Sequence, residues 1–477
     1  MGSGGKTGWL QGRLAARVGY LVAHGPHMAI GAAIVLGFPH LVAASEYGGF
    51  AVGFAFVNIA GAIFYGWLQL SLVRLAGGTD SLVPPHLSTV LLATLLPLLP
   101  CIAAAWLLSR LGFIGPWLPA AVAAGGFNAA TSMGQMARGL HRPKLYGAVG
   151  AARFILVLGL ALAFTRASAT QSALLYAVGC GSFGAAVLAI IGSIKTLRPD
   201  GRKAQSGPAI SVRALLAYGV PASLSLIAIM IMLNGDRFLL GWLYDPSVVA
   251  AFSAQSGAAR QIIYPVISAL GISVVPNALL VRKRASEEAA INSVATESAQ
   301  ILAITSPVVA IAVAFGSILA GIALPSAYRE GAAWVIPVST MAAYLMGCRL
   351  VRYDPVFHVL LRPRAIAKCA ATALVVWAIA LYPLTAAFGP VGTAGAGLLA
   401  ALAANLVAAV LIGKANIRFQ VIPVFALYTL VVCGVVATGA RLWMNGHALL
   451  GATLILCAAC YSFTLLLLRR CARGASS

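Results

Sequence analysis

The sequence predicts an all-α fold: a polytopic bundle of about fourteen transmembrane helices. Two observations lead to this prediction. Hydrophobic residues make up 61% of the 477-residue chain, only 9% of residues are charged, and the mean hydropathy is +0.95. Soluble globular proteins do not have this composition. The apolar residues also gather in runs of about 20, enough for a helix to cross about 30 Å of hydrocarbon.

The apolar runs follow one another along the chain with short loops between them. The expected helices of the first half are 15–43, 50–73, 88–109, 117–137, 145–165 and 172–194. Those of the second half are 212–243, 248–281, 299–322, 331–361, 365–387 and 392–413. Two further helices are expected at 420–441 and 448–468. Small residues at 179–186 (GCGSFGAA) indicate close helix contacts in the sixth run.

Basic residues are unevenly distributed between alternate loops, which predicts the orientation in the membrane. One set of loops holds clusters of Lys and Arg at 138–144, 195–203, 282–284, 362–368 and 414–418, and the tail holds another at 469–473. The other set holds only Arg110, Arg166, Arg329 and Arg441. By the positive-inside rule, both termini are expected in the cytoplasm.

Composition and short motifs suggest three parts. The polar segment 195–211 is a linker by composition, and a second long polar connection is expected at 281–298. We therefore expect a six-helix half at 1–200, a second at 201–415, and two helices with a basic cytoplasmic tail at 416–477. The halves share features, such as HGP at 24–26 and YGVP at 218–221. Six helices return the chain to the same side, so the repeats are parallel rather than inverted.

Several short motifs point to a known family. They include the Tyr47-Gly48 turn, YGVP at 218–221, GDRFLLG at 235–241, VVAAFSA at 248–254, Pro276 and FGPVGTAGAG at 388–397. Over residues 15–415 the chain resembles polysaccharide repeat-unit flippases of the multidrug/oligosaccharidyl-lipid/polysaccharide (MOP) exporter superfamily. Ala251 and Phe252 depart from the family's usual glycine-bearing tyrosine pattern in the eighth helix, which leaves the subfamily open.

The resemblance implies a function. Such a protein would flip undecaprenyl-pyrophosphate-linked oligosaccharide units from the cytoplasmic to the outer leaflet of a bacterial plasma membrane, by alternating access. The units would serve exopolysaccharide, capsule or O-antigen synthesis. Its partners would be this cargo, membrane lipids, a polysaccharide polymerase and export proteins. No cofactor is expected.

Charged residues inside the apolar runs are the candidate site residues, because a charge at membrane depth must face protein or water. Arg260, Arg153 and Arg237 are the candidate substrate-binding cations, since a guanidinium donates two parallel hydrogen bonds to phosphate. Asp236 and Arg260 lie at similar depths on helices joined by one turn at 244–247. A structural ion pair between them is therefore the alternative to a role for Arg260 in binding.

Asp354 and His358 are four residues apart on one helix, so they share a face. We consider two roles for them: proton coupling, or partners of Arg349 and Arg352. His24 and His27 have the spacing HxxH but no nearby carboxylate or thiolate, so we expect no metal there.

Other classes of function fit the sequence less well. The net charge of +22 does not indicate nucleic-acid binding, because the basic residues lie in short clusters between apolar runs. A polysaccharide polymerase would need paired carboxylates on long outer loops, but the chain has only ten acidic residues, and they are dispersed. A small-molecule or multidrug exporter of the same superfamily remains the nearest alternative.

Overall fold

The computed structural model describes residues 22–75, 87–112, 115–140, 142–197, 211–271 and 274–413. These residues form helices and no strand, and nine helical segments among them are long and apolar enough to cross a membrane. The predicted all-α, multi-pass membrane fold is therefore confirmed. The two helices expected at 420–441 and 448–468, and the basic tail, lie outside the described residues.

The chain divides into two compact units, Met1–Ser253 and Ala254–Ser477. The division falls within α11 (Pro246–Gly271), about fifty residues after the boundary expected at residue 200. The three-part organisation expected from the sequence stays a prediction, and the two units are described separately below.

Unit 1 starts with the helical segment Val22–His40, which ends in η1 (Ala33–Gly37) and η2 (Phe38–His40). The elements that follow are α2 (Ala44–Ala60), η3 (Gly61–Tyr65), α3 (Gly66–Leu75), α4 (Leu87–Leu95), α5 (Leu98–Arg110), α6 (Trp117–Gly139), α7 (Pro143–Ala167), α8 (Gln171–Leu197), α9 (Val212–Asn234) and α10 (Asp236–Leu243). The span Ser88–Arg110 is broken between α4 and α5 at Pro97, because proline lacks the N–H that would continue the helix.

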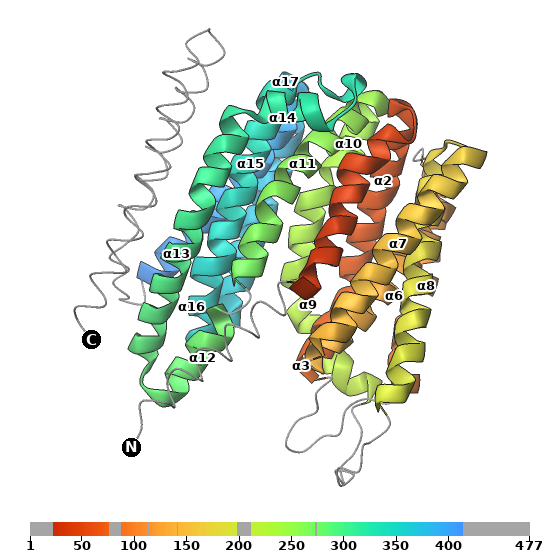
Figure 1. Ribbon diagram of the computed structural model, residues 1–477. Helices are drawn as coiled ribbons and strands as arrows, with labels where there is room; N and C mark the ends of the chain where they lie inside the picture. The colour runs from red at the N-terminus through yellow and green to blue at the C-terminus, as the bar shows by residue number, and fades with distance from the viewer. Residues whose placement is uncertain are drawn as a thin grey trace. The chain divides into compact units, whose positions relative to one another are not determined.

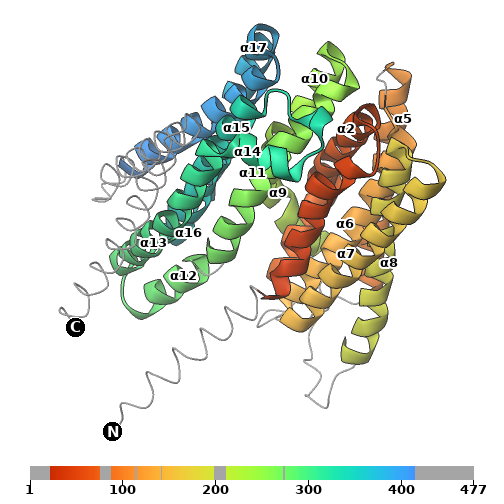
Figure 2. The ribbon, with the colours of Figure 1, turned by 45° about the horizontal axis from the view of Figure 1, so that its top comes forward.

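Helices α6, α7 and α8 lie side by side in both views (Figures 1 and 2). Glycines let their backbones approach closely. A Cβ atom added to Gly126 of α6 would lie 2.0 Å from the carbonyl oxygen of Gly179 in α8. One added to Gly181 would lie 2.7 Å from the backbone nitrogen of Val157 in α7. The close helix contacts expected for residues 179–186 are therefore confirmed.

Helix α9 packs against α3, which explains why the span Val212–Leu243 belongs to unit 1. The Ser71 hydroxyl donates a hydrogen bond of 2.6 Å to the carbonyl oxygen of Leu215. A Cβ atom on Gly219 would lie 2.0 Å from the carbonyl oxygen of Trp67. The glycine of the YGVP motif is thus required by the contact between the two helices.

Unit 2 contains the larger part of α11 and eight further elements: α12 (Val274–Arg284), α13 (Glu287–Ala314), α14 (Gly316–Ala323), η4 (Ser326–Tyr328), α15 (Ala332–Cys348), η5 (Arg349–Tyr353), α16 (Asp354–Val359) and α17 (Pro363–Gly413). Within α17, Gly389 has φ 59° and ψ −140°, a conformation open to glycine, and Pro390 follows. The chain therefore breaks between two helices inside FGPVGTAGAG, as the sequence predicted.

The prediction of a long polar connection at 281–298 is wrong. Helix α12 continues to Arg284 and α13 begins at Glu287. The Ser286 side chain caps α13 by accepting a hydrogen bond of 3.1 Å from the backbone N–H of Ala289. Glu287 and Glu288 lie in the first turn, where negative charge is favourable. A capped, polar helix extension has the composition of a loop, and composition alone did not distinguish the two.

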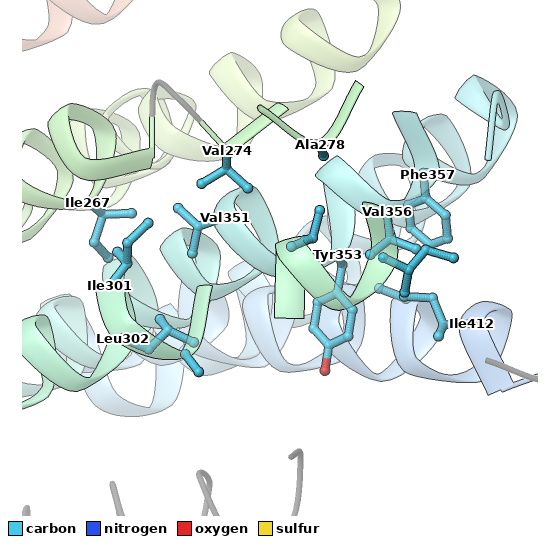
Figure 3. Packing of buried hydrophobic residues seen from close by; sticks show 14 of the residues in the cluster. Ile267, Val274, Ala278, Ile301, Leu302, Val351, Tyr353, Val356, Phe357 and Ile412 are labelled. Carbon is cyan, nitrogen blue, oxygen red and sulfur yellow. The ribbon is translucent and has the colours of Figure 1, made fainter. Parts of the chain in front are cut away.

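The core of unit 2 joins α11, α12, α13, α15, η5, α16 and α17, and Figure 3 shows part of it. Ile267 and Val351 are buried in this cluster, as are Val356 and Phe357. A Cβ atom on Gly271 would lie 2.7 Å from a methyl carbon of Val351. This packing holds η5 inside the unit together with the charged residues that η5 carries.

Candidate functional site

Arg153 of α7 is buried inside unit 1, with 4% of its surface exposed. Its Nε donates a hydrogen bond of 3.0 Å to the Ser182 hydroxyl on α8. Its Nη1 donates one of 3.3 Å to the Thr131 hydroxyl on α6, and its Cζ lies 3.7 Å from the centre of the Phe127 ring. Among the described residues, Nη2 has no hydrogen-bond partner. Arg153 is therefore a buried cation with a free donor rather than a side chain that extends to the membrane surface.

Tyr146, on the first turns of the same helix, holds the segment Val22–His40 in place. The His24 Nδ1 lies 2.8 Å from the Tyr146 hydroxyl oxygen, and the His27 Nε2 donates to the Tyr146 carbonyl oxygen at 3.0 Å. The rings of His27 and Tyr146 stack with 4.2 Å between their centres. These contacts explain the HxxH spacing. The described part of the chain also holds no group of three metal-ligating side chains.

Asp236 and Arg237 form a buried ion pair at the start of α10, with 2.7 Å between Arg237 Nη1 and Asp236 Oδ1. The same Nη1 donates to the carbonyl oxygen of Leu233 at 2.8 Å. This pair of neighbouring residues was not expected from the sequence. Because Asp236 belongs to unit 1 and Arg260 to unit 2, the pair Asp236–Arg260 stays a prediction, as does substrate binding by Arg237.

Element η5 of unit 2 carries two arginines that the sequence analysis considered only as partners of Asp354. Arg349 and Arg352 are both buried, with 3% and 4% of their surfaces exposed. The Arg349 Nε lies 3.5 Å from Asp354 Oδ2. In the described residues, neither Arg349 Nη1 nor Asp354 Oδ1 has a hydrogen-bond partner. The five-residue element is a π-helix, a form that is frequent at functional sites.

Arg260, the leading candidate from the sequence, lies half-buried on α11 in the same unit. It is within electrostatic reach of the Tyr264 hydroxyl, and so is Arg349. Arg260 and Arg349 thus belong to the same unit, and sequence reasoning did not select Arg349 as a site residue. The sequence carries a signal, since Arg349 and Arg352 lie within a long apolar run, but the only role it indicated for them is as partners of Asp354 and His358.

Asp354 and His358 lie one turn apart on α16, as the spacing predicted. Asp354 is buried, whereas His358 is exposed. The two groups interact electrostatically, and Asp354 also pairs with Arg349. Asp354 therefore pairs with Arg349, which was one of the two roles considered for it. A role of Asp354 and His358 in proton coupling stays a prediction.

No protein-family model and no curated protein matches the sequence, but solved structures match the fold. One is the lipid II flippase MurJ in an inward closed conformation, with a TM-score of 0.64 and 12% sequence identity. The match covers 95% of this chain and 98% of the MurJ chain. The multidrug transporter DinF-BH of the MATE family matches with a TM-score of 0.59 and 15% sequence identity. That match covers 85% of this chain and 96% of the DinF-BH chain. A MATE family transporter of the MOP superfamily in an inward-facing conformation matches with a TM-score of 0.55 and 13% sequence identity, over 84% of this chain and 98% of that chain. The chain thus shares its fold with these solved structures.

Proposed function

We propose that this protein is a membrane transporter that flips an anionic, lipid-linked oligosaccharide between leaflets. Its cargo would be an undecaprenyl-pyrophosphate-linked repeat unit, moved from the cytoplasmic to the outer leaflet of a bacterial plasma membrane by alternating access. The observation that carries the proposal is the buried Arg349, whose Nη1 has no partner in the described part of the chain although its Nε faces Asp354.

The physical argument rests on the cost of a buried cation. A charge inside the membrane-spanning region costs at least about 2.5–3.5 kcal/mol unless protein, water or a ligand compensates it. Arg153 and Arg349 each retain a free guanidinium donor among the described residues. A diphosphate offers several acceptor oxygens and a formal negative charge, so it complements such donors. Arg349 and Arg153 are therefore proposed as cargo-binding cations, and Arg260, half-buried on α11, is proposed as a third.

The fold supports transport as the activity. The MurJ structure covers nearly the whole of both chains, and it is described as a lipid II flippase. We propose no catalytic activity, since acid–base catalysis needs positioned proton donors and acceptors. The carboxylates that the structure shows buried, Asp236 and Asp354, are both paired with arginines.

A multidrug exporter is the second candidate, because MATE transporters share the fold. The two candidates differ in the charge that they must recognise. An exporter of cationic molecules needs unpaired carboxylates in its binding site, whereas a flippase for a diphosphate needs cations. The buried, partly unsatisfied arginines favour the flippase.

The test uses a host that lacks its own flippase, with polymer output as the readout and membrane abundance as a check. Arg349→Met and Arg260→Ala remove a proposed cargo cation. Arg260→Lys keeps the charge and loses the planar fork. Arg213→Ala, at an exposed position on α9, is the matched control.

Loss of one charge-assisted contact should lower output about tenfold or more in Arg349→Met and Arg260→Ala. Output should fall less in Arg260→Lys and stay normal in Arg213→Ala. Full polymer output from normally abundant Arg349→Met and Arg260→Ala proteins would refute the assignment. Failure of the wild-type protein to restore polymer, together with increased resistance to cationic dyes, would support the exporter instead.

A further inference from the structure

A basic pocket of about 520 Å³ lies where α16 meets α17. Three cationic side chains line it, those of Arg362, Arg364 and Lys368. Apolar side chains, including Phe357 and Leu411, form another part of its wall. The volume is within the range of about 300–1,000 Å³ that is usual for small-molecule sites. The pocket therefore combines a cationic side with an apolar side.

The turn between the two helices fixes the position of the cations. The backbone N–H of Arg362 donates to the carbonyl oxygen of Phe357 at 2.9 Å, and that of Leu361 donates to His358 at 3.2 Å. These two bonds form a Schellman motif, which usually has glycine at the left-handed position. Here Leu361 occupies it with φ 53°, and 71% of the leucine's surface is exposed. A strained turn thus presents an apolar side chain beside the three cations.

The charge of this pocket is not neutralised within the described residues. No carboxylate there forms an ion pair with Arg362, Arg364 or Lys368, and no acidic residue lines the pocket. The three basic residues also lie in and just before the first turns of α17, where the helix dipole adds partial positive charge. An anion entering the pocket would therefore meet only favourable charges along its wall.

The pocket is placed at a membrane–water boundary by the helices on either side of it. The candidate spans Ala332–Val359 and Pro363–Gly413 end and begin at this turn. Chain between two successive membrane spans lies at headgroup level, and basic residues next to spans interact with anionic lipids. At this level a ligand with a charged head and an apolar body can occupy both sides of the pocket.

We propose that this pocket binds the headgroup of an anionic membrane phospholipid. Arg362, Arg364 and Lys368 would hold the phosphodiester group, while Phe357 and Leu411 would contact the adjoining part of an acyl chain. None of the proposed cargo cations lines this pocket, and the lipid site goes beyond the proposed function. Free phosphate would leave the apolar side of the pocket unused, so the lipid is the occupant that the wall chemistry favours.

The test measures lipid affinity with the full-length protein, purified and freed of lipid in a neutral detergent. The probes are dioleoyl phosphatidylglycerol, dioleoyl phosphatidylcholine and inorganic phosphate, each titrated while the thermal unfolding midpoint is followed. The variant R362Q/R364Q/K368Q removes the three cations of the pocket. The matched control R213Q/K283Q/R284Q removes three basic charges at helix ends that do not line it. The single variant R364Q serves if the triple variant does not fold.

A basic residue near a membrane surface strengthens the binding of anionic lipid about fivefold, so three such residues together raise the affinity about a hundredfold. Phosphatidylglycerol should therefore stabilise the wild-type protein and the control at similar concentrations. About a hundredfold more should be needed for the triple variant, and about fivefold more for R364Q. Phosphatidylcholine and inorganic phosphate should have little effect. An equal loss in the control, no loss in either pocket variant, or equal stabilisation by inorganic phosphate would each overturn the proposal.

Discussion

Asp354→Asn removes the carboxylate charge beside Arg349 with little change in shape, and its cost follows from the geometry. The charged atoms are 3.5 Å apart and both side chains are buried. With an effective dielectric constant of about 20, the attraction at this distance is about 5 kcal/mol. Removing one partner of a buried pair leaves the other charge unsatisfied, which typically costs 3–5 kcal/mol. The two values agree, so Asp354→Asn should destabilise unit 2 by about 3–5 kcal/mol.

A double-mutant cycle tests this estimate. Arg349→Met removes the cation and keeps similar volume, and Arg349→Met/Asp354→Asn removes both charges. The double variant should be less destabilised than Asp354→Asn alone, because no charge is left unpaired. Equilibrium unfolding in mixed detergent micelles gives the free energies, with Asp245→Asn at an exposed turn position as control. Losses that add within about 0.5 kcal/mol would refute the pairing.

Three further predictions concern packing, orientation and the α16–α17 turn. Gly219→Val should lower the folded yield markedly, because even a Cβ atom there would lie 2.0 Å from the Trp67 carbonyl oxygen. A normal yield would show that α3 and α9 can move apart to make room. With native cysteines removed, an impermeant thiol reagent should label Ser247→Cys but not Ala285→Cys in intact cells, and the reverse pattern would invert the expected topology. Leu361→Gly should stabilise the protein by about 0.5–1 kcal/mol, because glycine adopts a φ of 53° without the strain that leucine has there. Destabilisation would show that the contacts of the leucine side chain contribute more than the backbone strain costs.

The sequence predicted the helices well because burial in lipid leaves a strong signal. Apolar runs of the required length identified spans such as Val212–Leu243 and Ala332–Val359, and turn residues located the break near Gly389. Polar helix ends gave no such signal. The first turns of α13 have the composition of a loop, and the Ser286 cap that makes them helical became clear only from its hydrogen bond.

The candidate site was predicted less completely, because pairing depends on which groups approach one another in the fold. Sequence depth correctly placed Arg153 inside the bundle, but it did not indicate the pair of Asp236 with its neighbour Arg237. For Arg349 the sequence indicated only a role as a partner of Asp354 and His358. The structure shows that Asp354 engages one edge of its guanidinium and leaves Nη1 free within the described residues.

Direct binding of the lipid diphosphate is the measurement that tests the central claim most closely. Purified wild-type protein would be titrated with undecaprenyl pyrophosphate and with undecaprenol, which has the same tail and no phosphate, while thermal stabilisation is followed. We predict stabilisation by the diphosphate alone, weakened about tenfold or more in Arg349→Met and unchanged in Arg213→Ala. Equal stabilisation by both lipids, or an unchanged response in Arg349→Met, would contradict the claim that buried arginines recognise an anionic cargo.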